Sequence, residues 1–78
     1  SQMNNETLNE ELVKKLIKTQ PDIYAILRGE VKSKKSPEEE KKEILKIFLK
    51  NQPDIYAIMM GEVENERKIE MKKMQNKE

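Results

Sequence analysis

The chain of 78 residues contains no cysteine and no histidine. Without thiols there are no disulfide bonds and no cysteine nucleophile, and such a chain fits a reducing compartment. Without histidine, the usual zinc ligands and the commonest general base near neutral pH are missing as well. These absences predict that the protein is not an enzyme and that it uses no metal and no cofactor.

Glycine and long apolar runs are also scarce. The two glycines, Gly29 and Gly61, lie thirty-two positions apart, so the chain has no glycine-rich phosphate loop. No apolar run approaches the roughly 20 residues of a membrane-spanning helix, and nothing resembles a secretory signal. We therefore expect a soluble, cytoplasmic protein with no membrane contact and no small-molecule substrate.

Charge of one sign does not dominate. Sixteen basic and fifteen acidic side chains give a formal net charge of +1, so no overall field favours nucleic acid or an anionic membrane. The glutamates at 38–40 are not read as a metal cluster, because neighbouring helical residues point in different directions and acidic residues suit a helix start. A chain of this length has room for one domain, 1–78, with a modest core.

The chain contains one twelve-residue phrase twice. Residues 20–31 read QPDIYAILRGEV and residues 52–63 read QPDIYAIMMGEV, so ten of the twelve positions are identical. Proline near the start, with Asp22 or Asp54 after it, is typical of a first helical turn. Thr19 and Asn51 precede each phrase, and we expect them to be the N-caps.

The glycine of each phrase has two interpretations. As a helix stop, Gly29 and Gly61 would adopt the left-handed conformation that commonly ends a helix, and this is the interpretation we favour. Alternatively the helices continue, and Ala25 with Gly29, and Ala57 with Gly61, form small-residue faces that let another helix come close. Both interpretations remain open at this point.

Each phrase is preceded by an amphipathic segment. Four apolar residues recur at helical spacing before each copy: Leu12, Val13, Leu16 and Ile17, then Ile44, Leu45, Phe48 and Leu49. Thr7 is the predicted N-cap of the first segment, and Ser36 with Pro37 and Glu39 is a strong start signal for the second. This divides the chain into a helical hairpin at 8–31, a basic linker at 32–36, a second hairpin at 37–63 and a charged extension at 64–78.

The predicted fold is all-α, with two tandem αα-hairpin repeats of period thirty-two packed about a pseudo-twofold axis as a four-helix domain. We expect the two phrase helices to face each other in the middle and to bury Ile23, Ile26, Ile55 and Ile58. The extension carries a sparse stripe formed by Met60, Val63, Arg67, Met71 and Met74. It is expected to be either a helical continuation or, more in keeping with its composition, a fraying tail.

The function we expect is binding of another protein, as an adaptor, an inhibitor or a small regulatory subunit. The second hairpin is the more apolar, since Ile47 replaces Lys15 and Met60 replaces Arg28. These side chains are either core or a contact patch, and methionine suits both. The predicted contact residues are Tyr24, Arg28, Ile47, Tyr56, Met59 and Met60. The partner would be a different protein or a second copy of the chain, as a homodimer.

A small DNA-binding regulator is the alternative. Two tight helical corners in tandem resemble paired helix-turn-helix units, and Lys32, Lys34 and Lys35 could meet phosphate. A recognition helix must also expose side chains that reach base edges. The first phrase offers only Arg28 for this, and the second replaces it with Met60.

Overall fold

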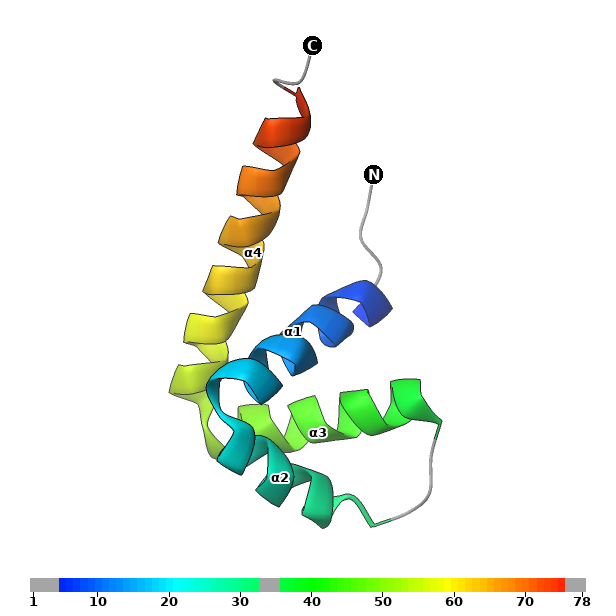
Figure 1. Cartoon of the computed structure of the whole chain (residues 1–78). Helices are drawn as coiled ribbons and strands as arrows, with labels where there is room; N and C mark the ends of the chain where they lie inside the picture. The colour runs from blue at the N-terminus through cyan, green and yellow to red at the C-terminus, as the bar shows by residue number, and fades with distance from the viewer. Residues whose placement is uncertain (1–4, 33–35, 76–78) are drawn as a thin grey trace.

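The computed structural model of the chain describes residues 5–32 and 36–75. In that part the chain forms four helices and no strand: α1 (Asn5–Thr19), α2 (Pro21–Glu30), α3 (Pro37–Asn51) and α4 (Pro53–Gln75). The all-helical class is therefore confirmed for the described residues. In Figure 1, α1 and α3 pack side by side and run in the same direction. From the ends of these two helices, α2 turns to one side and α4 turns to the opposite side.

Each corner between two helices is a single glutamine that precedes a proline. Proline disfavours the α conformation at the residue before it, and Gln20 accordingly has φ −136° and ψ 64°. The Gln20 amide still donates to the Leu16 carbonyl at 2.8 Å, and its carbonyl accepts from the Tyr24 amide at 3.0 Å. Gln52, with φ −138° and ψ 65°, makes the equivalent two bonds at the same lengths. The two corners are thus locally alike.

The predicted N-caps of the phrase helices are wrong. Thr19 and Asn51 are the last residues of α1 and α3. The Thr19 hydroxyl donates to the Lys15 carbonyl at 2.7 Å, a bond made back along its own helix. The physical reason is that proline removes only its immediate neighbour from the helix, so the cap position falls on Gln20, which makes no side-chain cap bond.

The start predicted for the third helix is confirmed. The Glu39 amide donates to Ser36 Oγ at 3.3 Å, and the Ser36 amide donates to Glu39 Oε1 at 3.3 Å, which completes a capping box. The start predicted for the first helix is wrong, because α1 begins at Asn5, before Thr7.

The helix-stop interpretation is wrong for Gly61, whereas the helix of the first phrase does end close to Gly29. α2 ends at Glu30, one residue past Gly29, and α4 runs through Gly61 to its end at Gln75. Neither glycine has a positive φ. Only α4 continues, as in the alternative interpretation, and a Cβ built on either glycine meets nothing within 4 Å. No described element of the chain therefore approaches these glycines closely.

The core lies between α1 and α3 and is closed by α2 on one side and α4 on the other. The buried residues are Leu12, Val13 and Leu16 of α1, Leu27 of α2, Ile44, Leu45 and Phe48 of α3, and Met59 and Val63 of α4. Leu16 is completely buried, and Phe48 is the largest fully buried side chain. The two amphipathic segments therefore supply most of the core.

The expectation that the phrase helices meet in the middle is wrong. α2 and α4 each contact α1 and α3 but not each other. As a result Ile26 and Ile58 are 62% and 61% exposed, whereas Ile23 and Ile55 pack partly buried against the core. Each phrase helix has only one covered face, and at 3.6 residues per turn a side chain next to a buried one is rotated away from it.

The described part of the extension is helical. Residues 64–75 continue α4, which rises above the other helices in Figure 1, and the fraying tail expected from its composition does not appear there. Of the predicted linker 32–36, residues 33–35 lie outside the described part, as do residues 76–78 of the extension. The described chain is elongated as a result, with extents of 49 × 25 × 18 Å.

The first prediction concerns Gly61, which lies inside α4 with open space beside it. Gly61→Ala should stabilise the protein by about 1 kcal/mol, because glycine is the poorest helix former after proline. Thermal unfolding should then shift upward by roughly 4–8 °C for a domain of this size. Gly29→Ala is the matched control and should have a smaller effect, because Gly29 lies at the end of α2. A loss of stability in Gly61→Ala would contradict the open space at this position.

Candidate interaction surface

One predicted contact residue is part of the core. Met59 is 4% exposed and belongs to the cluster that includes Leu16 and Val63. It lies one helical turn before Val63, so both side chains point from α4 toward the rest of the core. Its assignment to a contact surface is therefore wrong.

The other predicted residues lie on different helices and differ in exposure. Tyr24, Ile47, Tyr56 and Met60 are half-buried and pack against the core, whereas Arg28 is exposed. The Tyr56 ring lies against Phe48, with centroids 6.0 Å apart and an interplanar angle of 60°. Tyr56 also lines a shallow groove together with Leu49 of α3. Because α2 and α4 do not touch, the predicted residues do not form one compact patch.

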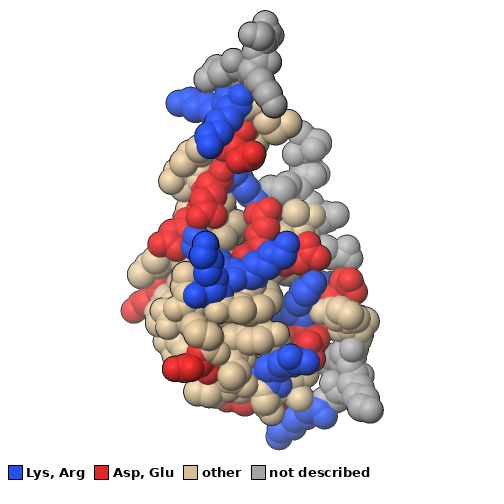
Figure 2. Space-filling model, in the orientation of Figure 1, with Lys and Arg blue, Asp and Glu red and all other residues tan. Residues whose placement is uncertain are grey.

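Sequence reasoning missed the most exposed apolar side chains of the two phrases. On α2, Ile26 lies exposed beside Ala25 and Gly29, and α4 repeats this arrangement with its own isoleucine, alanine and glycine. We call these two surfaces the outer faces: Ala25, Ile26 and Gly29 on α2, and Ala57, Ile58 and Gly61 on α4. In Figure 2 uncharged residues gather over the lower body, while charged residues of both signs cover the upper part of α4.

The two copies of the repeat differ at the positions that are buried in both and agree, throughout the phrase only, at the positions that are exposed in both. Every pair of equivalent positions that is buried in both copies has changed: Leu12 and Ile44, Val13 and Leu45, Leu16 and Phe48, Leu27 and Met59. Every pair of phrase positions that is exposed in both copies is unchanged: Pro21 and Pro53, Asp22 and Asp54, Ala25 and Ala57, Ile26 and Ile58, Gly29 and Gly61, Glu30 and Glu62. Outside the phrase, three pairs that are exposed in both copies have changed: Glu10 and Lys42, Ile17 and Leu49, Thr19 and Asn51. The agreement at exposed positions is therefore complete only within the phrase.

Ion pairs tie the second half of α4 to α1. Lys15 Nζ lies 2.6 Å from Glu66 Oε2 and 3.6 Å from Glu62 Oε1. The hydrogen bond to Glu66 raises the pKa of Lys15 above its ordinary 10.5. A raised pKa means that this contribution to stability is present at neutral pH and is lost only as the pH rises through the raised value.

Arg67 makes a further ion pair between these helices. Its Nε donates to Glu11 Oε1 at 2.6 Å, and its side chain is only 18% exposed. Its second guanidinium nitrogen, Nη2, is buried and has no hydrogen-bond partner among the described residues. Glu11 therefore compensates only part of the desolvated guanidinium.

The described residues contain no group of acidic side chains placed to hold a metal ion. Within the same residues, no helix combines the length and the apolar character that crossing a membrane requires. Of the lysines proposed to meet phosphate, Lys32 is exposed after the end of α2, and Lys34 and Lys35 lie outside the described part.

Comparison of the chain with protein families, with curated proteins and with solved structures found no match in any of the three.

The second prediction concerns the ion pair between Glu11 and Arg67. Glu11→Ala should destabilise the protein by about 1 kcal/mol, because it leaves a largely buried guanidinium without its carboxylate. The effect is no larger because solvent already screens the more exposed carboxylate of the pair. Arg67→Met should have less than half that effect, because an apolar side chain suits the site and Glu11, 41% exposed, is left facing water. Urea unfolding monitored by circular dichroism measures both. Equal losses from the two variants would contradict the asymmetry.

Proposed function

We propose that this chain is a non-enzymatic protein-binding module, acting as an adaptor, an inhibitor or a small regulatory subunit, and that its outer faces are the contact surfaces. The observation that carries the proposal is the retention of an exposed isoleucine and an exposed helical glycine in both copies of the phrase. Protein partners commonly cover exposed apolar surface of this kind.

The glycines support a close contact with a partner helix. An interior helical glycine costs about 1 kcal/mol relative to alanine, and in Gly61 neither the backbone conformation nor a neighbouring atom requires it. A residue without Cβ allows a second backbone to approach closely. We therefore infer that the partner presents a helix whose backbone lies against Gly29 or Gly61.

We further propose that the two hairpins are related by a pseudo-twofold axis along the paired helices α1 and α3. The matching geometry of the corners at Gln20 and Gln52 supports this arrangement. It would place the outer face of α2 and that of α4 on opposite sides of the domain. One chain would then bind two copies of the same partner segment.

The charges beside the outer faces favour a protein over DNA. Asp22 and Glu30 lie exposed beside Ile26 on α2, and Asp54 and Glu62 occupy the equivalent exposed positions on α4. Carboxylates in these places would repel phosphates. A partner helix with basic residues flanking an apolar seam suits this surface better.

The third prediction tests the outer faces by partner capture. The purified chain serves as bait in an extract of its source cells, and the captured protein is identified and quantified. The double variant Ile26→Lys with Ile58→Lys should lose capture, and each single variant should keep part of it, because one face remains. Leu49→Lys is the matched control, since Leu49 is 46% exposed but lies outside both faces.

Circular dichroism should be unchanged in all four variants, because none of the replaced side chains belongs to the buried core. Undiminished capture by the double variant would contradict the proposed contact surface. If Leu49→Lys lost capture while the other variants kept it, the contact surface would lie on α3 instead.

A further inference from the structure

The end of α4 carries an exposed isoleucine among lysines. Ile69 is 48% exposed, and Lys68, Lys72 and Lys73 all lie within about 100° of it around the helix. Lys68, Ile69 and Lys72 also line a shallow hollow on this side of α4. None of the three lysines forms an ion pair with another described residue. We call Lys68, Ile69, Lys72 and Lys73 the lysine arm.

The arm has little support within a single chain. Every residue from 68 to 75 is exposed. Short helices without tertiary contacts are marginal in water, so a surface that covered the arm would stabilise the end of α4.

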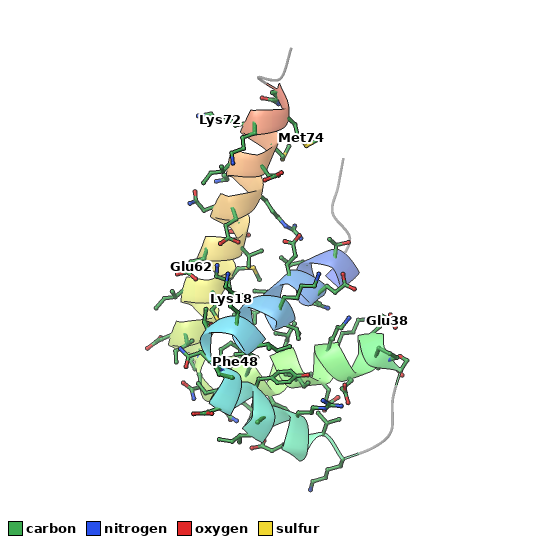
Figure 3. The ribbon with its side chains drawn as sticks, in the orientation of Figure 1. Lys18, Glu38, Phe48, Glu62, Lys72 and Met74 are labelled. Carbon is green, nitrogen blue, oxygen red and sulfur yellow. The ribbon has the colours of Figure 1, made fainter. Side chains whose placement is uncertain are left out.

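The opposite side of the same segment has a different character. Met71 and Met74 continue the buried face of α4 beyond α1, and in Figure 3 Met74 leaves the helix on the side opposite Lys72. Glu70 is the one carboxylate between positions 67 and 75, and it lies about 100° around the helix from Ile69. The side that carries the arm is therefore basic.

The charges of α4 change sign along its length. Residues 53–66 include four carboxylates and no basic residue, whereas residues 67–75 include four basic residues and one carboxylate. The helix dipole favours this order, but only within the first and last turns. It therefore accounts for Lys72 and Lys73, and it accounts neither for Lys68 nor for the exposed Ile69.

The outer faces have the opposite charge around an isoleucine of their own. On α2, Asp22 and Glu30 lie four residues before and after Ile26, and α4 repeats this arrangement around Ile58. We inferred above that these faces suit a helix with basic residues beside an apolar seam. The lysine arm meets each part of that description.

Nearby basic residues leave the outer face of α2 acidic. Arg28 is rotated by about 200° from Ile26 around α2, so it points to the other side, and Lys32 lies beyond the end of the helix. On α4, by contrast, Lys15 lies 3.6 Å from Glu62 and offsets part of the charge of that face. The face of α2 is thus the better complement of the arm.

We propose that the lysine arm of one copy of this chain packs on the outer face of α2 of another copy. Ile69 then lies against Ile26, in the space left by Ala25 and Gly29, and the lysines lie beside Asp22 and Glu30. The inference rests on the proposed function, because it names the end of α4 as one of the helices that an outer face binds.

The contact is heterologous, so each copy offers one arm and one face and further copies can be added. An arm of about two turns buries less than the roughly 1,200 Å² of a standard stable interface, so self-association is weak and concentration-dependent. It also weakens as salt is added, because exposed charges flank the contact.

The fourth prediction is tested by sedimentation equilibrium of the full chain over a range of concentrations. Ile69→Glu should raise the dissociation constant of self-association at least about tenfold, because it places a carboxylate against Asp22 and Glu30. Met74→Glu is the matched control: it introduces the same residue into the same segment, but about 140° around the helix from Ile69. It should leave the dissociation constant within about twofold of the original.

Two lysine variants test which face receives the arm. Ile26→Lys should weaken self-association as strongly as Ile69→Glu, whereas Ile58→Lys should leave it within about twofold of the original. Ile26→Lys keeps its arm and Ile69→Glu keeps its face, so an equal mixture of these two variants should form a complex of one copy of each. None of the replaced side chains belongs to the buried core, and unchanged circular dichroism confirms that each variant is folded.

Three results would overturn the proposal: a chain that sediments as a monomer at every concentration, self-association that survives Ile26→Lys or Ile69→Glu, and a mixture of these two variants that forms no complex. The proposed function fails by a different result. Capture of another protein that is undiminished in the double variant of Ile26 and Ile58 would contradict it, whatever the state of self-association.

Discussion

The rest of the fold depends on the steric conflict between a proline ring and the residue before it. That conflict takes Gln20 and Gln52 out of the helix, yet each keeps a hydrogen bond to the helix on either side, so each corner is one residue long and has little freedom. The carbonyls that accept from these corners belong to Leu16 and Phe48, which are also fully buried between α1 and α3. The same two residues therefore take part in both the corners and the core. Once α1 packs on α3, the directions of α2 and α4 follow.

The helix ends within the first copy of Gly-Glu-Val and continues through the second, and the two copies have different surroundings. After the first copy, α2 stops at Glu30 and the Val31 amide turns back to the Arg28 carbonyl at 3.3 Å. After the second, α4 continues: Val63 is buried in the core, Glu62 and Glu66 reach Lys15, and Arg67 reaches Glu11 on α1. The equivalent of Lys15 in the second hairpin is Ile47, which has no charge to offer α2. These contacts support α4 beyond its glycine as it passes α1.

Sequence signals that act within a few residues predicted most of the helices. Features that depend on tertiary contacts were predicted wrongly. The capping box at Ser36, the prolines at the helix starts and the phase of the apolar residues act within a few residues, so they can be read directly from the sequence. Gly61 also looked like a local stop, but α4 runs through it and packs Val63 against the core. Burial could not be assigned from apolar character alone, since Ile26 is exposed and Met59 is core. Which side of a short helix is covered depends on how many neighbours it has, and sequence periodicity does not give that number.

The exposed surface of this chain is informative because the chain is small. A domain of this size buries a limited apolar area and has little stability to spare, so each feature that lowers stability needs a compensating reason. The glycine inside α4, the isoleucines on the outer faces and the methionines beyond α1 bring no benefit to the isolated fold. They also occur in an ordered way: the isoleucines once in each copy of the phrase, and the methionines in line with the buried face of α4. The glycine and the isoleucines are the features on which the proposed binding to another chain rests.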